Sequence, residues 1–270
     1  MNALTFVKLG GSIITDKTRA ATVDPAAIQR FAHEIAQSLS VSSDLRLVVG
    51  HGSGSFGHSV GDRYQAHLGP KAETGWEGYV QTAAAAARLN RLVTDIFLEA
   101  RLPVVSLQPS ASSWCRNGEL LSLEVRPLHR LLSAGLIPLL YGDVALDEMR
   151  GYTIISTEAI FAYLARHLAP SRIILVGRVD GVFTADPLRD PHAELIPKIT
   201  PSNVETVERR LGASHGVDVT GGMLSKVQTM YRLALAHPDL RVHIISGRRP
   251  GLLQEVLLHP DHPGGTVIHA

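Results

Sequence analysis

The chain has 270 residues, 45% of them apolar, which is enough for one large α/β domain or two small ones with a sizeable core. A net charge of +1 with 19% charged residues gives no broad basic field, so nucleic acid is not expected as a partner. Cys115 is the single cysteine, which excludes an internal disulfide. No apolar run approaches the ~20 residues of a membrane span, and the first residues lack a signal-peptide layout. We therefore expect a cytoplasmic protein with no membrane association.

Short runs rich in β-branched and other apolar residues predict the strands, and nearly all are continuously apolar. Strands buried on both faces have this composition, as in a parallel sheet covered by helices. In chain order, strands are predicted at residues 4–9, 45–49, 103–107, 137–141, 173–176 and 242–245, and helices at 25–39, 75–100, 124–134, 158–168 and 223–236. Their alternation predicts an α/β fold with an open, mainly parallel sheet sandwiched between helices (α/β/α).

Two turn signals predict β-hairpin insertions into this sheet. One is Asn117-Gly118, and the other is the segment 147–151 between two strand-like runs. No low-complexity linker divides the chain, so a single domain over residues 1–270 is expected. Ligands of such folds gather at the carboxyl ends of the strands, and we assign an acceptor-binding half to about residues 1–170 and a nucleotide-binding half to 171–270.

The string His51-Gly52-Ser53-Gly54-Ser55-Phe56-Gly57-His58 directly follows the second predicted strand. Its glycines let backbone N–H groups approach an anion, and the terminal histidine can donate to a phosphate oxygen, so the string predicts a phosphate-binding loop. It also matches G-x-G-x-x-G, which leaves a dinucleotide-binding oxidoreductase open. Against that alternative, the string follows the second strand and not the first, and Gly61 and Asp62 soon after it disfavour an immediately packed helix.

Three lysines stand in contexts that suit phosphate chemistry. Lys8 ends the first predicted strand beside Gly10, Gly11 and Ser12, Lys17 follows soon after, and Lys226 comes after Gly221-Gly222 at the predicted start of a helix. Each of them alone equally fits a surface lysine. Together they offer the positive charge on both sides of a moving phosphoryl group that its transfer requires. No G-x-x-x-x-G-K-[ST] motif occurs, which argues against a P-loop enzyme.

Taken in order, motifs between residues 8 and 226 resemble the amino acid kinase superfamily and, within it, the isopentenyl phosphate kinases. The resemblance rests on residues 8–12, Lys17, 51–58, 103–110, Gly142-Asp143, 180–187 and 218–226. His58 favours the isopentenyl phosphate kinases, because in them a histidine at this place binds the acceptor phosphate, whereas uridylate and acetylglutamate kinases lack it.

The resemblance implies that Mg²⁺-ATP donates its γ-phosphoryl group directly to isopentenyl phosphate, for isoprenoid biosynthesis, without a covalent intermediate and without a metal held by the protein. It implies catalytic roles for Lys8, Lys17, His58, Glu158 and Lys226. It implies ATP binding by Lys8, Gly10, Gly11, Ser12, Gly54, Asp180, Gly181, Val182, Phe183, Thr184, Ala185, Asp186, Gly222 and Lys226. It implies acceptor binding by Ser53, Gly54, His58, Trp76, Tyr79, Ala83, Gly142, Asp143 and Ser156. A homodimer is also implied.

In this interpretation the protein mainly positions the two substrates and neutralises the charge of their phosphates. Lys8 and Lys226 contact the donor phosphates, and Lys17 stabilises the γ-phosphoryl group in transfer. A phosphate monoester is largely ionised at neutral pH, so no general base is needed. Residues such as Trp76 and Tyr79 would form the apolar wall for a five-carbon chain, although their helical spacing also fits a simple core.

Two departures from the family pattern concern the lysines and the nucleotide loop. Glu158 replaces an aspartate that orients the lysines, with one more methylene of reach, and Arg178 stands where an acidic residue is common. Other acceptors remain as alternatives: a small phosphonate such as fosfomycin, or UMP. A non-catalytic nucleotide-binding regulatory or storage protein of the same fold is a further alternative, against which the three lysines and Glu158 argue.

Overall fold

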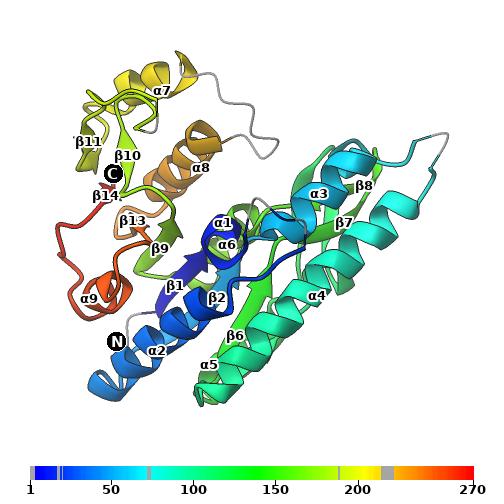
Figure 1. Ribbon diagram of the computed structural model, residues 1–270, viewed down its shortest axis with the longest axis horizontal. Helices are drawn as coiled ribbons and strands as arrows, with labels where there is room; N and C mark the ends of the chain where they lie inside the picture. The colour runs from blue at the N-terminus through cyan, green and yellow to red at the C-terminus, as the bar shows by residue number, and fades with distance from the viewer. Residues whose placement is uncertain (1–3, 17–18, 20, 72–73, 188, 214–221) are drawn as a thin grey trace.

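The computed structural model describes residues 4–16, 19, 21–71, 74–187, 189–213 and 222–270. Within these residues the main sheet has eight strands in the order β12-β14-β13-β9-β1-β2-β6-β3 (Figure 1). Their bounds are β1 (Leu4–Leu9), β2 (Arg46–His51), β3 (Val104–Ser106), β6 (Ile137–Tyr141), β9 (Arg172–Gly177), β12 (Lys198–Ile199), β13 (Arg241–Ser246) and β14 (Thr266–Ile268). All neighbouring pairs are parallel except β13 with β14. The carboxyl ends of β1, β2, β6, β9 and β13 therefore meet at one edge.

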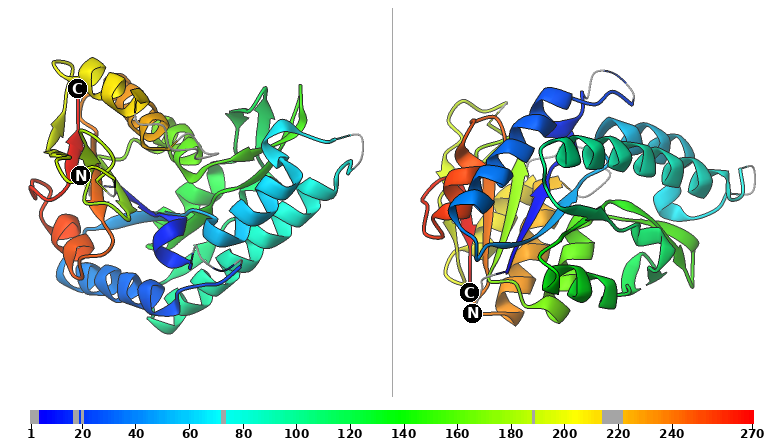
Figure 2. Two further views of the ribbon diagram at one scale, coloured as in Figure 1. Left: turned by 45° about the horizontal axis from the view of Figure 1, so that its top comes forward. Right: turned by 90° about the horizontal axis from the view of Figure 1, so that it is seen from below.

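Helices cover both faces of the sheet, as the right-hand view of Figure 2 shows. One face carries α2 (Pro25–Val41), α4 (Glu77–Glu99) and α9 (Leu252–Leu258), and the other carries α5 (Arg126–Ser133), α6 (Thr157–Leu168), α7 (Val204–Ala213) and α8 (Gly222–Ala236). Strand β1 feeds both cores: Val7 and Leu9 join the first, and Phe6 joins the second, where it meets Phe161 with ring centroids 5.0 Å apart. The predicted α/β/α sandwich is confirmed.

The long predicted helices and strands are confirmed to within two residues at each end. Local signals fix the helix starts: the Asp24 carboxylate accepts a hydrogen bond from Ala27 N–H at α2, and the Ser156 hydroxyl accepts one from Ala159 N–H at α6. The sequence did not predict α7, α9, the one-turn helix α1 (Gly11–Ile14), the 3₁₀ turns η1 (Ala66–Leu68) and η2 (Pro109–Ala111), or the short strands β12 and β14. Two or three residues are too few to show a strand's alternation.

The prediction of a loop over residues 51–58 is wrong for residues 54–58, which are helical. Helix α3 (Gly54–Tyr64) begins inside the glycine string and continues through Gly61 and Asp62, so the loop between β2 and the helix is reduced to Gly52 and Ser53. Gly54 has φ +49, and the glycines at 57 and 61 allow close packing: a Cβ on Gly57 would overlap the Ser53 side chain, and one on Gly61 would lie 3.3 Å from Ile154. The glycines therefore serve helix packing as well as the loop.

Both predicted hairpins form, in a separate four-stranded sheet of order β5-β4-β7-β8. Its strands are β4 (Trp114–Arg116), β5 (Glu119–Ser122), β7 (Asp143–Asp147) and β8 (Gly151–Ile155). Asn117 and Gly118 both have positive φ, 51° and 86°, as a two-residue hairpin turn requires. The Asp147 carboxylate joins the two hairpins because it accepts hydrogen bonds from N–H groups in both turns, at Asn117, Gly118, Met149 and Arg150.

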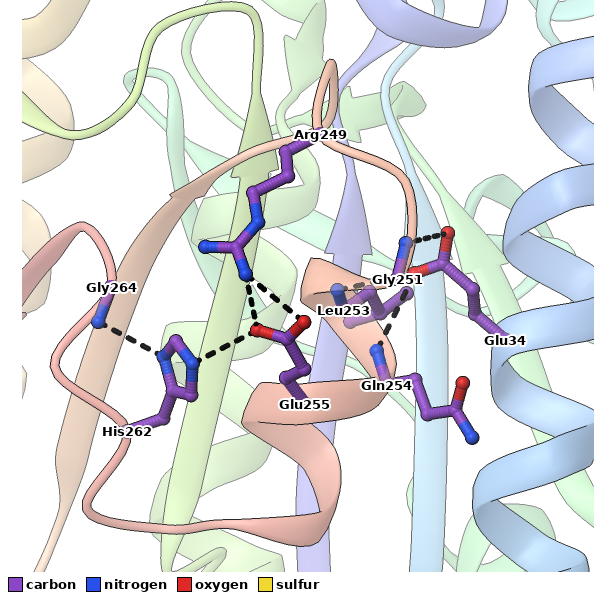
Figure 3. Close-up of polar contacts among 8 residues, drawn as sticks. All are labelled: Glu34, Arg249, Gly251, Leu253, Gln254, Glu255, His262 and Gly264. Atoms are coloured by element: carbon purple, nitrogen blue, oxygen red, sulfur yellow. Dashed lines mark hydrogen bonds and ion pairs between the residues drawn. The ribbon is translucent and has the colours of Figure 1, made fainter.

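Helix α9 is held in place by carboxylates at its start (Figure 3). Glu34 of α2 accepts hydrogen bonds from the N–H groups of Gly251, Leu253 and Gln254, the free donors of the helix N-terminus. Glu255 pairs with Arg249 at 2.8 Å and with His262 at 3.0 Å. These contacts tie α2 to the loops after β13.

In the described part of the chain no helix is long and apolar enough to cross a membrane.

Candidate active site

Two glycine segments interlock at the carboxyl edge of the sheet, one after β1 and the other after β2. We call Gly10, Gly11 and Gly52 to Gly54 the phosphate cradle. A Cβ on Gly11 would overlap the backbone nitrogen of Gly54 and come within 2.5 Å of its Cα, and one on Gly52 would lie 2.8 Å from Gly11 N. Gly52 N–H also donates to Leu9 O at 3.0 Å. The structure thus brings together two motifs that are about 40 residues apart in sequence.

Side chains and neighbouring strands fix the cradle further. Thr15 Oγ1 donates to Gly11 O at 2.7 Å and accepts from Ser55 N–H at 3.0 Å, so one hydroxyl joins both glycine segments. Gly10 N–H donates to Val176 O at 2.8 Å, which ties the cradle to β9. Helices α1 and α3 both begin at this cradle, and N–H groups at a helix start that have no partner within the protein can bind anions.

Beside the cradle, Glu158 lies between two of the predicted lysines. Lys8 Nζ contacts Glu158 Oε1, and Lys226 Nζ is 3.6 Å from the same oxygen. Lys8 lies on β1, Glu158 in the first turn of α6, and Lys226 on α8, so three elements meet here. The exposed fractions of these side chains rise from 11% at Lys8 to 27% at Lys226.

The charge on Glu158 is strongly favoured. Burial raises the pKa of this carboxyl, but Lys8, Lys226 and the hydrogen bond from Lys8 outweigh burial and bring its pKa down to about 2. The N-terminus of α6 also favours a negative charge at this place. The side chain of Glu158, one methylene longer than that of an aspartate, reaches both lysines. One carboxylate thus holds two cations at the edge of the cradle.

Three aromatic rings form a cluster on the other side of α3. We call Trp76, Tyr79 and Tyr152 the acceptor wall, after the role that the sequence predicts for the first two. Their ring centroids are 5.3 to 5.8 Å apart, and Trp76 remains half exposed. Tyr79 lies on α4, which packs against α3 and η1, and Tyr152 lies on β8, which packs against η1. Tyr152 was not predicted from the sequence, because only the fold brings β8 to the helix.

Four further predicted acceptor-binding residues lie on α4, at the start of β7 and at the start of α6: Ala83, Gly142, Asp143 and Ser156. Ala83 is half-buried one turn along α4 from Tyr79, and Asp143 is 1% exposed at the start of β7. Burial raises the pKa of Asp143, while hydrogen bonds from the N–H groups of Ser110 and Val144 oppose this shift. Gly142 N–H donates to His51 O, and Ser156 caps α6. These two therefore have structural contacts of their own.

The predicted nucleotide loop follows β9. Val182 and Phe183 form strand β10, which pairs with β11 (Leu195–Ile196). Val182 N–H donates to Thr266 Oγ1 at 2.7 Å, and a Cβ on Gly181 would lie 2.6 Å from that oxygen. Asp180, Thr184, Ala185 and Asp186 lie at the solvent-accessible side of this loop. Gly222 begins α8, the helix that carries Lys226.

Some predicted residues lie outside the part of the chain that the structure describes. Lys17 and residues 218–221 are among them, as is the side chain of His58, whose backbone lies in α3. The structure adds residues to which the sequence gave no role: Thr15, Thr157 and the ring of His51. Thr157 Oγ1 donates to His51 O at 2.7 Å. Contacts between residues about 100 positions apart leave no local sequence signal.

Among the described residues, no group of three or more His, Cys, Asp or Glu side chains could hold a metal ion. The hydrogen-bond donors of the site are lysines and backbone N–H groups, which bind phosphate oxygens. The arrangement is suited to binding phosphate groups near a partly exposed aromatic cluster.

Comparison with known proteins agrees with this description. The model of the amino acid kinase family matches residues 3–246. The isopentenyl phosphate kinase of Methanothermobacter thermautotrophicus is 32% identical over 97% of this chain and 98% of its own, and that of Haloferax volcanii is 33% identical over 92% and 97%. A Thermoplasma acidophilum isopentenyl phosphate kinase product complex superposes with a TM-score of 0.80 at 27% identity, covering 98% of this chain and 100% of that one. The chain belongs to the amino acid kinase family, and these full-length relatives within it are isopentenyl phosphate kinases.

Proposed function

We propose that the protein transfers the γ-phosphoryl group of ATP to isopentenyl phosphate, giving isopentenyl diphosphate and ADP. The observation that carries this proposal is the position of α3, which begins in the phosphate cradle and packs against α4, the helix that bears the acceptor wall. A charged phosphate and a short apolar chain on one molecule match these two surfaces. The likeness over the full chain to isopentenyl phosphate kinases supports the same acceptor.

On the donor side, Lys8 and Lys226 neutralise the phosphates of ATP, and Glu158 holds the two ammonium groups together at the edge of the cradle. Backbone N–H groups at Gly11 and Gly54 add donors that need no reorganisation, while Gly10 N–H is engaged with Val176 O. Lys17 completes the charge around the group in transfer. The nucleoside would lie along the loop at residues 180–186.

On the acceptor side, His58 and the backbone N–H of Ser53 hold the phosphate in line, and the acceptor wall surrounds the alkenyl chain. Gly142 and Asp143 close the pocket from β7. The acceptor oxygen is already ionised at neutral pH, so the protein needs only to align it. Burial raises the pKa of Asp143. In this pocket Asp143 serves as a hydrogen-bonding group and not as a general base.

The proposal includes Mg²⁺ as the ion of the ATP complex, where it would offset phosphate charge and be held by phosphate oxygens. It also includes a cytoplasmic homodimer, on the family resemblance. Light scattering of the purified protein at several concentrations would measure the oligomeric state.

Initial rates of ADP formation test the proposed acceptor directly. Isopentenyl phosphate, fosfomycin and UMP are compared at equal concentrations with saturating Mg²⁺-ATP. A rate at least ~10-fold higher with isopentenyl phosphate is expected, because only this acceptor presents both a phosphate and a short apolar chain to the two surfaces. A preference for fosfomycin or UMP would overturn the acceptor, and no turnover with any of them would favour a non-catalytic nucleotide binder.

His58→Ala separates acceptor from donor binding. We expect a KM for isopentenyl phosphate raised ~10-fold or more, because a charge-assisted hydrogen bond to phosphate is lost, with the Kd of ATP nearly unchanged. His129, an exposed histidine on α5, provides the matched control. His129→Ala should leave both the KM for isopentenyl phosphate and the Kd of ATP unchanged. Loss of ATP affinity in a folded His58→Ala protein would show that the acceptor assignment is wrong.

A further inference from the structure

His51 is a fully buried polar residue at the end of β2, and its ring has partners on two sides. Nδ1 lies 3.1 Å from the carbonyl oxygen of Gly52, and Nε2 lies 3.2 Å from Oδ1 of the Asn90 side-chain amide on α4. The other end of that amide lies 2.5 Å from the hydroxyl of Ser106, at the end of β3. The ring is stacked on Tyr141, with centroids 5.7 Å apart and planes 12° apart. Both ring nitrogens and one face of the imidazole are therefore in contact with neighbours.

The backbone of His51 joins other parts of the site. Its carbonyl accepts from Thr157 Oγ1 at 2.7 Å and from Gly142 N–H at 3.0 Å. Thr157 immediately precedes Glu158, and Gly142 immediately precedes Asp143. One residue thus contacts the phosphate cradle, α4, α6 and the start of β7. A buried polar network with all members satisfied is a rigid element.

The hydrogen bonds define the state of the ring. Burial lowers the pKa of His51, which favours the neutral imidazole with one N–H. The structure places Asn90 Oδ1 toward Nε2 and Asn90 Nδ2 toward the Ser106 hydroxyl. With the two ends of this amide exchanged, a neutral ring satisfies both neighbours: Nδ1–H donates to Gly52 O, Nε2 accepts from the Asn90 NH₂ group, and the Asn90 oxygen accepts from Ser106. The oxygen and nitrogen of an amide are interchangeable by assignment, so the Asn90 side chain fits this orientation.

The bond to Gly52 O has a direct geometric consequence. A peptide unit is planar and trans, so its C=O and N–H point in opposite directions. The unit whose carbonyl faces His51 carries the N–H of Ser53, which must therefore point away from the imidazole. Ser53 N–H is the donor that the proposed function assigns to the acceptor phosphate.

We propose that His51 is a positioning residue for the acceptor: its Nδ1–H, held in place by Asn90 and Tyr141, fixes the Gly52–Ser53 peptide and thereby aims Ser53 N–H at the acceptor phosphate. The inference rests on the proposed function and adds to it a residue that touches neither substrate. Misplacing one donor by about 1 Å can lower a rate ~10²-fold, so a measurable effect is expected without loss of the fold.

Two amide substitutions separate the two ring nitrogens. The amide of His51→Asn is as many bonds from Cα as Nδ1, so it can still donate to Gly52 O. The amide of His51→Gln is as many bonds from Cα as Nε2, so it retains the contact with Asn90 and loses the one with Gly52. The kinetic constants kcat and KM for isopentenyl phosphate are measured in both variants, together with the Kd of ATP by calorimetry.

We expect kcat/KM for isopentenyl phosphate to fall ~30-fold in His51→Gln and to stay within ~5-fold of the wild type in His51→Asn, with the Kd of ATP unchanged in both. Asparagine is the smaller side chain and leaves the larger cavity, so a purely structural role predicts the reverse order. That reverse order, equal kinetics in both variants, or a parallel loss of ATP affinity would overturn the proposal.

His243 provides the matched control. It is a buried histidine on β13 of the same sheet, and neither of its ring nitrogens has a hydrogen-bond partner among the described residues. Its Asn and Gln variants should keep kcat/KM and show no preference between the two amides. A similar preference at His243 would mean that the effect at His51 is one of general core packing.

A second readout does not depend on turnover. The exchange rate and chemical shift of the Ser53 amide proton, measured by NMR without ligand, should change in His51→Gln and stay close to wild type in His51→Asn. If the wild type fails to phosphorylate isopentenyl phosphate, the proposed function fails while this readout still decides the role of His51. Equal Ser53 signals in both variants would refute that role.

Discussion

In the phosphate cradle two glycine segments touch backbone to backbone, and Gly11 and Gly54 leave no room for a Cβ. In the acceptor wall, by contrast, the contacts are between side chains, Trp76 is 50% exposed, and the Tyr152 hydroxyl is buried with no hydrogen-bond partner among the described residues. The cradle is thus determined by the backbone and admits one geometry. The wall is determined by side chains that can change size, so one scaffold can keep its phosphate chemistry while its acceptor changes.

Gly11→Ala should have the largest effect. The added Cβ would overlap the backbone of Gly54 and press on that of Gly52. Because these contacts are with main-chain atoms, the cradle must open. We expect kcat to fall by ~10²-fold or more and ATP affinity to fall with it, as measured by steady-state kinetics and calorimetry.

Gly212→Ala is the matched control for this change. Gly212 lies in helix α7 with only a Leu224 side-chain carbon 3.8 Å from an added Cβ. This variant should keep wild-type kinetics and gain ~0.5–1 kcal/mol of stability, because alanine favours the helix. Wild-type kinetics in Gly11→Ala would contradict the interlocked cradle.

Glu158→Gln should come next. The substitution keeps the shape but removes the charge that holds Lys8 and Lys226 together. We expect kcat to fall ~10- to 100-fold, because the two ammonium groups repel each other and leave their positions. Glu158→Asp, which keeps the charge on a shorter side chain, should recover part of kcat.

The same variant tests the pKa of Glu158. Its folded value of about 2 lies below the ordinary 4.5, so its contribution to the free energy of unfolding is present above pH ~4.5 and is lost as the pH falls toward ~2. The stability difference between wild type and Glu158→Gln, measured by urea unfolding, should therefore shrink over that interval. A stability difference that stays constant down to pH ~2 would show that the lysines do not lower the pKa of Glu158.

A smaller and more selective effect is expected from Trp76→Ala. Removing this half-exposed ring opens one side of the acceptor wall, so the KM for isopentenyl phosphate should rise ~10-fold while the Kd of ATP stays constant. Trp114→Ala, which removes a ring 43% exposed on the hairpin sheet, is the control and should change neither constant. Equal effects of the two substitutions would remove Trp76 from the acceptor site.

Tyr152→Phe should have the smallest effect on kinetics. The substitution removes a buried hydroxyl that has no partner among the described residues and keeps the ring that contacts Trp76 and Tyr79. We expect a melting temperature equal to or above that of the wild type, because an unsatisfied buried hydroxyl costs ~1 kcal/mol or more. A large loss of kcat would show that the hydroxyl binds the acceptor.

How much the sequence predicts differs between these regions for a physical reason. The strands before Gly10 and Gly52 were predictable, because their continuous apolar runs require burial on both faces, and glycines directly after a strand indicate a close backbone approach. The sequence could not predict three other features: the contact of Gly11 with Gly54, the start of α3 at Gly54, and the hydrogen bond from Thr157 to His51. They depend on which strands are neighbours in the sheet, and a local pattern does not contain that information.

The central claim is phosphoryl transfer to a phosphate that carries a short apolar chain. We would record ³¹P NMR spectra of the wild-type protein with Mg²⁺-ATP and an equimolar mixture of isopentenyl phosphate, fosfomycin and UMP in one tube. The account predicts that the isopentenyl phosphate signal is converted first, into the coupled pair of a diphosphate, as ADP appears. Consumption of fosfomycin or UMP ahead of it, or ATP left intact in the presence of all three, would contradict the account.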